Sequence, residues 1–223
     1  MKKSIITASL LALGITSASA MDLDIFVGLE GNMVDTSSSF SATTGTIEYW
    51  KAGNTTPTNT FSPLTGAADE RSMGYGIGLK AGVVLNENHR ISVIATDYSN
   101  LEVLGADMDM QTYTLNYDYM FVNDSKATPY LGLNAGMSDV EILGYSDMSE
   151  MYGVQGGVIV EITDHIEWEM GASYSILTSN PTTGVQTKTY NHNEIQSLVF
   201  NGAEAEVELQ DMVKTYIGLN YKF

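Results

Sequence analysis

The sequence predicts an all-β fold, an eight-stranded antiparallel up-and-down β-barrel that spans a membrane. Three observations lead to this prediction. Apolar residues recur at every second position in eight segments, short and long connections alternate between these segments, and the charged residues within them share a face with Gly, Ser and Asn. Because successive side chains of a strand point to opposite faces, a period of two indicates a sheet with two different faces.

The first twenty residues predict export. They read MKKSIITASLLALGITSASA, with Lys2 and Lys3 before an apolar run and Ala18-Ser19-Ala20 as a small-residue cleavage site. This is the pattern of a secretory signal peptide, and its apolar run is shorter than the ~20 residues that a spanning helix needs. We therefore expect residues 1–20 to be a signal peptide and residues 21–223 to form one barrel domain.

Eight segments have about the length, ~9 to 11 residues, that a tilted strand needs to cross a bilayer. They are residues 22–31, 73–85, 89–98, 111–122, 128–138, 151–162, 165–177 and 212–223. Tight connections near 86–89, 123–127 and 163–165 alternate with long ones at about 32–72, 99–110, 139–150 and 178–211. Short turns on one side and long loops on the other are typical of an outer-membrane barrel.

Two other architectures are compatible with parts of this pattern. A soluble sandwich or lipocalin-like barrel also alternates, but its Gly-rich face would then meet solvent, where so many glycines would weaken the strands. A ten-stranded barrel with a wider lumen would result if residues 46–51 and 195–200, inside the first and last long connections, were membrane strands.

Aromatic residues on the apolar face gather toward both ends of the predicted strands. Rings of this kind prefer the boundary between water and lipid, so two aromatic girdles are expected. Tyr75, Tyr113 and Tyr174 lie toward the long connections, and Tyr119, Phe121, Trp168, Tyr221 and Phe223 lie toward the tight turns.

The opposite face is predicted to fill the lumen. Eight strands enclose an interior only just wide enough for side chains, and an unpaired charge there is costly, so we expect the inward charges to form an ion-pair network that plugs the barrel. A second interpretation is that these pairs gate a narrow ion path. The expected members are Glu30, Lys80, Arg90, Asp118, Glu161, Glu167, Glu169, Lys214 and Lys222.

The last strand resembles the C-terminal strand by which bacterial outer-membrane proteins are recognised for assembly, with Ile217, Leu219 and Tyr221 at alternate positions before Phe223. The segments TPYLGLNAG (128–136) and YGVQGGV (152–158) resemble those of the opacity-protein and OmpA/OmpX-like family of small barrels. The resemblance implies an outer-membrane location with both termini in the periplasm. It also implies contact with outer-membrane lipid and lipopolysaccharide, and with the barrel assembly machinery during biogenesis.

Composition excludes several functions. A formal net charge of -17 disfavours nucleic-acid partners, and with no cysteine the chain has no thiolate nucleophile and no cysteine-zinc site. The three histidines lie apart in the sequence, so we expect no enzyme, no catalytic or metal site and no cofactor. The predicted function is a structural and surface-interaction role through the long loops, with an unidentified extracellular partner. The alternative is a narrow porin or channel for ions or small solutes.

Overall fold

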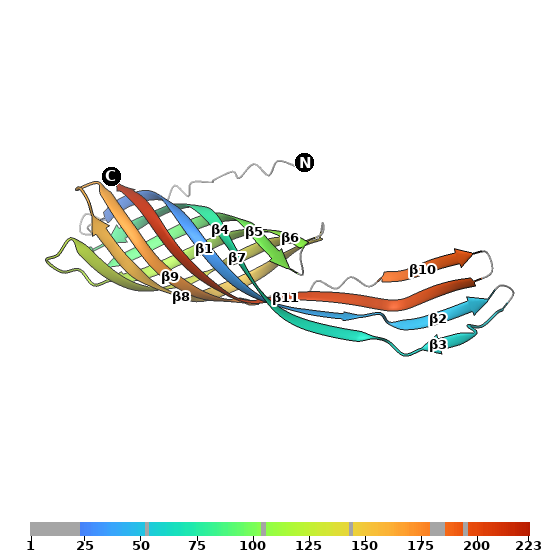
Figure 1. The fold of residues 1–223 in the computed structure, drawn as a ribbon. Coiled ribbons are helices and arrows are strands. Elements are labelled where there is room, and N and C mark those ends of the chain that lie inside the picture. Colours follow the sequence, from blue (N-terminus) through green and yellow to red (C-terminus); the bar gives the residue numbers. More distant parts are fainter. Residues whose placement is uncertain (1–22, 52–53, 104–105, 143–144, 179–185, 194–195) are drawn as a thin grey trace, which may run out of the picture.

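Eight antiparallel strands close into a barrel in the computed structural model (Figure 1), which describes residues 23–223 except 52–53, 104–105, 143–144, 179–185 and 194–195. Around the barrel the order is β1-β4-β5-β6-β7-β8-β9-β11, and pairing of β1 with β11 closes the ring. This confirms the predicted eight-stranded, all-β fold. The barrel strands are β1 (Leu23–Thr43), β4 (Thr65–Leu85), β5 (His89–Val103), β6 (Ala106–Met120), β7 (Ala127–Ile142), β8 (Tyr145–Glu161), β9 (Ile166–Thr178) and β11 (Gln196–Lys222).

The alternation in the sequence sorts side chains between the outside and the lumen. In β4, Ile77 and Leu79 lie on the outer surface, whereas Lys80 is buried. In β1, Leu29 is 54% exposed and the next residue, Glu30, is 2% exposed. An exposed belt of Leu, Ile, Val and Met is stable only against an apolar solvent, so this surface faces lipid. The described part of the chain contains no helix with the length and apolar composition needed to span a bilayer.

The strands are longer than predicted, because much of each expected long connection continues as strand. β1 extends to Thr43 and β4 begins at Thr65, while β5 ends at Val103 only three residues before β6 begins at Ala106. Beyond the apolar belt the outward positions are polar, as at Ser37, Ser39 and Ser41 of β1. Once both faces are polar or small, the period of two in hydrophobicity disappears although the backbone pairing continues.

Three barrel strands project beyond the barrel end opposite the C-terminus and form an arm (Figure 1). The arm consists of residues 38–43 of β1, 65–71 of β4 and 196–210 of β11, together with β2 (Thr46–Lys51), β3 (Asn59–Phe61) and β10 (Gln186–Asn193). Residues 46–51 pair with 196–201 inside this arm, outside the ring of eight strands. The ten-strand alternative is therefore wrong. The predicted signal peptide, residues 1–20, lies outside the described residues.

We predict that a charge placed on the lipid-facing belt destabilises the barrel. Leu79→Arg removes a side chain in the middle of the belt, and Arg near a bilayer midplane costs about 2–4 kcal/mol. Ala67→Arg is the matched control, because Ala67 has the same orientation on the same strand but lies in the arm. Denaturant unfolding in lipid vesicles measures both variants, and equal losses of unfolding free energy would contradict a lipid-facing belt.

Candidate functional site: the lumen and the arm

Six buried charged residues form one alternating chain of ion pairs across the lumen. In order they are Lys214, Glu30, Lys80, Glu169, Arg90 and Asp118, and each is at most 7% exposed. Three cations face three carboxylates, so the chain is electrically balanced when all six are ionised. Each residue comes from a different strand, so the ion pairs connect six of the eight barrel strands through the lumen.

Lys80 and Arg90 connect opposite walls of the barrel through Glu169. Lys80 Nζ lies 3.1 Å from Glu30 Oε2 and 2.9 Å from Glu169 Oε2, while Arg90 Nη2 lies 2.8 Å from Glu169 Oε1. Arg90 also contacts Asp118 Oδ2 at 2.8 Å. Because β5, which carries Arg90, and β9, which carries Glu169, are opposite each other in the ring, this contact bridges the lumen.

Neutral side chains complete the coordination of the carboxylates. The Tyr130 hydroxyl donates to Glu169 Oε1 at 2.7 Å and lies 2.6 Å from the Tyr216 hydroxyl. Asn220 donates to Glu169 Oε2 at 2.9 Å, and Gln155 donates to Asp118 Oδ1 at 2.6 Å. The Arg90 guanidinium lies 4.5 Å from the centre of the Tyr130 ring, a cation–π distance. Every carboxylate oxygen of Glu169 is thereby engaged, as a buried anion requires.

The structure brings together six of the nine charged residues predicted for the lumen and separates the other three. Lys222 lies near the tight turns, with its Nζ 3.4 Å from Glu167 Oε1 and 3.7 Å from Asp24 Oδ2. Glu167 is half-buried, and Glu161 is exposed at the end of β8. These three residues have inward-facing strand positions but lie where the lumen opens to solvent.

Apolar layers lie on both sides of the ion-pair chain. Toward the tight turns, Met120, Tyr130 and Ile159 form a small cluster. Toward the arm, a larger cluster contains Val34, Tyr98, Leu101, Met108, Met110, Val140, Met151, Leu177, Leu209 and Met212. Methionine fills irregular spaces well because it is unbranched and flexible. The lumen is thus layered, with charge between two apolar clusters.

Sequence reasoning missed the neutral members of the lumen. Tyr130 and Tyr216 occupy inward positions, and glycines provide space for them. A Cβ atom added to Gly157 would lie 2.7 Å from the Tyr130 hydroxyl, and one added to Gly171 would lie 2.7 Å from the Tyr216 hydroxyl. A glycine on the inward face of one strand beside a large inward side chain of another is the signal that would have identified this packing.

The predicted girdle residues all lie on the outside of the barrel. Tyr75, Tyr113 and Tyr174 are exposed toward the arm, and Tyr119, Phe121 and Trp168 are exposed toward the tight turns. At the turn end, the rings of Tyr119 and Phe121 pack edge to face, with centroids 5.2 Å apart. All four residues proposed as an assembly signal also face outward. They are Ile217, Leu219, Tyr221 and Phe223. Their roles in lipid anchoring and in assembly stay predictions.

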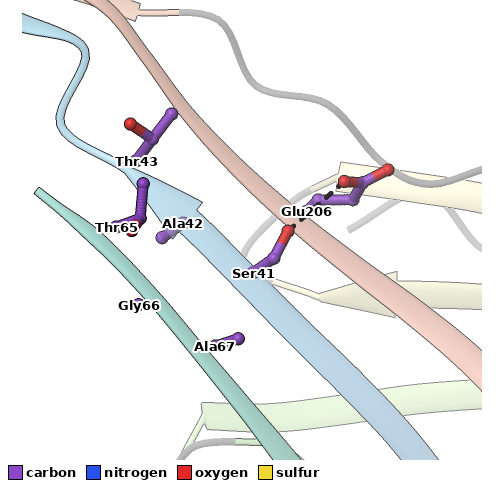
Figure 2. Close-up of a pocket in the computed structure, with 7 residues that line it drawn as sticks. All are labelled: Ser41, Ala42, Thr43, Thr65, Gly66, Ala67 and Glu206. Carbon is purple, nitrogen blue, oxygen red and sulfur yellow. Dashed lines mark hydrogen bonds between the residues drawn. The ribbon is translucent and has the colours of Figure 1, made fainter. Parts of the chain in front are cut away.

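The arm carries a shallow hollow of about 290 Å³ between β1, β4 and β11 (Figure 2). Its lining is small or polar, and the Ser41 hydroxyl donates to Glu206 Oε2 at 3.3 Å. The other lining residues are Ala42, Thr43, Thr65, Gly66 and Ala67. In the described part of the chain, no group of three or more His, Asp or Glu residues is arranged to hold a metal ion.

Comparison with solved structures identifies the fold. Neisserial surface protein A aligns with 86% of this chain and 97% of its own, at 17% identity and a TM-score of 0.52. The fold is that of a small outer-membrane barrel. A closed barrel with a lipid-facing belt crosses a membrane, and the bacterial outer membrane is where such barrels lie.

Two further structures align at lower scores, which support no inference of their own. Outer membrane protein H of Pseudomonas aeruginosa aligns with 90% of this chain and 99% of its own, at 19% identity and a TM-score of 0.47. The outer-membrane protease OmpT of Escherichia coli covers 91% of this chain and 96% of its own, at 12% identity and a TM-score of 0.34. No family model and no curated protein matches the sequence.

We predict that breaking the buried ion-pair chain costs far more than breaking an exposed ion pair. Arg90→Met leaves buried Asp118 without a cation and leaves Glu169 with Lys80 alone, so the expected loss of unfolding free energy is about 3–5 kcal/mol. Arg71→Met is the matched control, because Arg71 pairs with Asp35 and Asp211 outside the barrel and its side chain is 59% exposed. There we expect a loss below about 1 kcal/mol. Denaturant unfolding in lipid vesicles measures both, and similar losses would contradict a stabilising role of the chain.

Proposed function

We propose that this protein is a non-enzymatic outer-membrane barrel that does not conduct and that presents a rigid β-arm at the cell surface. The observation that carries the proposal is the layered lumen, where a balanced ion-pair chain lies between two apolar clusters. A hydrated pore needs a continuous polar path, and buried Met108, Met110 and Met212 interrupt one on the arm side. The narrow-channel alternative has no comparable support.

We also propose that the protein is not an enzyme. His89 Nδ1 lies 2.8 Å from the Tyr117 hydroxyl, and the His165 ring stacks on Tyr221, so both rings belong to the outer aromatic surface at the tight-turn end. Neither forms a hydrogen bond to a carboxylate or to a Ser hydroxyl side chain among the described contacts. This arrangement lacks the nucleophile, base and orienting group of a hydrolytic site.

Surface interaction is assigned to the arm because the arm is the part of the chain that continues beyond the lipid belt. Its strands are extensions of β1, β4 and β11, so the barrel fixes their direction and spacing. Segments held rigidly by a scaffold and exposed to solvent are where proteins commonly carry recognition. Outer-membrane lipid and lipopolysaccharide are the expected partners of the belt and of the polar positions just above it.

We predict that the purified protein gives no long-lived conductance steps in a planar lipid bilayer. The double variant Arg90→Ala/Glu169→Ala removes two large side chains from the central layer together and keeps the charge balanced. It should give at most small, flickering steps, because the apolar clusters remain. Large and stable steps from the unmodified protein would contradict the closed lumen.

The arm tip is expected to be dispensable for folding. In the test variant, Asn-Gly replaces residues 44–64 and connects Thr43 to Thr65. These two residues already pair across β1 and β4, and Asn-Gly is the sequence that best suits a two-residue hairpin turn. We expect heat-modifiable gel migration to be retained and the unfolding free energy to change by less than about 1 kcal/mol, because no barrel strand is shortened. Loss of the folded form would show that the tip is structural.

A further inference from the structure

Three buried polar side chains on the arm side of the ion-pair chain have hydrogen-bonding groups that no described protein group satisfies. Asn32, two residues nearer the arm than Glu30, has a partner at neither Nδ2 nor Oδ1, and Asn134 Nδ2 and Ser138 Oγ also have none. All three residues are at most 5% exposed. Buried polar groups in native proteins are nearly always hydrogen-bonded, either to protein or to ordered water, so these four atoms need a partner.

The two asparagines face each other across the lumen, because β1 and β7 are opposite strands of the ring. Followed from strand to strand through β4, β5 and β6, the register partners of Asn32 lead to Val140 of β7. Followed the other way, through β11, β9 and β8, they lead to Tyr130. Since the strands are tilted, the level of Asn32 on β7 lies midway between these two residues, at residue 135. Inward-facing Asn134 is next to that position.

The inward side chains around Asn134 are short. Its register partner on β8 is Gly153, which in turn pairs with Ser175 of β9. The Ser175 hydroxyl donates to Asn134 Oδ1 at 3.0 Å. Along β7, only Gly136 separates Asn134 from Ser138 on the inward face. An eight-stranded barrel is just wide enough for its inward side chains to fill, so short side chains facing each other across it leave space between them. We call the level of Asn32, Asn134 and Ser138 the polar layer.

Larger side chains lie on both sides of the polar layer. On the arm side, Tyr98 of the apolar cluster packs over Gly76, the register partner of Asn32, where an added Cβ would lie 2.7 Å from the tyrosine ring. On the turn side lies Tyr216, the register partner of Asn32 in β11. Its hydroxyl contacts that of Tyr130 beside Glu169. The polar layer is therefore enclosed between the arm-side apolar cluster and the ion-pair chain.

Charge indicates which kind of molecule suits the polar layer. The neighbouring ion-pair chain is already balanced, with three cations and three carboxylates. Lys214, at its end, contacts one carboxylate among the described residues, that of Glu30, although its ammonium has three donors. A neutral molecule that both donates and accepts hydrogen bonds satisfies the amides, the hydroxyl and the ammonium without adding charge to the lumen.

We propose that the polar layer is a binding site for a cluster of ordered water molecules enclosed in the lumen. The waters bridge Asn32 to Asn134 and Ser138 and hydrate Lys214 at the end of the ion-pair chain. Buried waters of this kind make about three hydrogen bonds each, to polar groups that the protein leaves unpaired. The inference goes beyond the proposed function and does not rest on it, because an enclosed cluster is no path for ions.

Nuclear Overhauser cross-peaks between water and side-chain amides test the site in the unmodified protein, folded in detergent micelles and labelled with nitrogen-15. We expect such cross-peaks at Asn32 and Asn134. Asn220 is the matched control, since it is 2% exposed and its Nδ2 donates to Glu169 Oε2 at 2.9 Å. It should give no cross-peak. A missing cross-peak at Asn32 or Asn134, or one of equal strength at Asn220, would overturn the inference.

Two substitutions of Asn32 distinguish a hydrated layer from a dry one. In a hydrated layer Asn32→Ala leaves space that a further water occupies, whereas Asn32→Leu displaces water and leaves Asn134 unpaired. We therefore expect the unfolding equilibrium constant in lipid vesicles to be about tenfold larger for Asn32→Leu than for Asn32→Ala. A dry layer predicts the reverse order, because leucine fills the space and removes an unpaired amide, and that order would contradict the proposal.

Met110 provides the matched controls, because it is fully buried in the arm-side apolar cluster. There Met110→Ala should unfold more readily than Met110→Leu, the order expected of a dry site. The remaining occupant to test is an anion held by the Lys214 ammonium and the amide donors. Unfolding midpoints of the unmodified protein should agree in sodium chloride and in sodium gluconate of equal ionic strength. Stabilisation by chloride alone would show that an anion occupies the layer, and the water cluster would be wrong.

Discussion

The narrowness of an eight-stranded barrel is the constraint on which the rest of the structure depends. Its interior holds side chains and little else, so every inward charge must find its partner inside the ring. The six-residue chain from Lys214 to Asp118 meets this requirement because each charged side chain contacts one or two of opposite sign. Glycines on the inward face leave room for Tyr130, which donates a hydrogen bond to Glu169, and for Tyr216, whose hydroxyl contacts that of Tyr130.

The barrel was predictable because its two environments are so different. Lipid outside and packed charge inside impose opposite requirements on neighbouring residues, and this produces the strict alternation of Leu79 and Lys80 or of Leu29 and Glu30. The same physical contrast identified the inward charges by position. It did not show which of them meet, because contacts such as Arg90 with Glu169 depend on which strands lie opposite each other in the closed ring.

The arm was not predictable as a continuation of the barrel strands, since the contrast between the two faces ends with the lipid. Along Ser37, Ser39 and Ser41 the outward side chains face water, and no hydrophobic period marks the strand. Only the strand-like segments at residues 46–51 and 195–200 indicated additional β-structure in the long connections. The sequence alone could assign them either to the membrane or to a hairpin above it. Pairing between them in the arm decides the question, and it could not be read from either segment alone.

Barrel and arm solve the problem of strand edges in different ways. Closure of β1 on β11 removes every edge within the membrane, where an unpaired backbone group would be costly. Above the membrane the strands no longer form a ring, so edges reappear, and water can solvate them at little cost. Asp69, followed by Glu70 and Arg71, places charge on the part of β4 that pairs only with β1 in the described chain. Charged side chains discourage an exposed edge from pairing with another chain, so the arm can keep in water an open edge that the barrel could not keep in lipid.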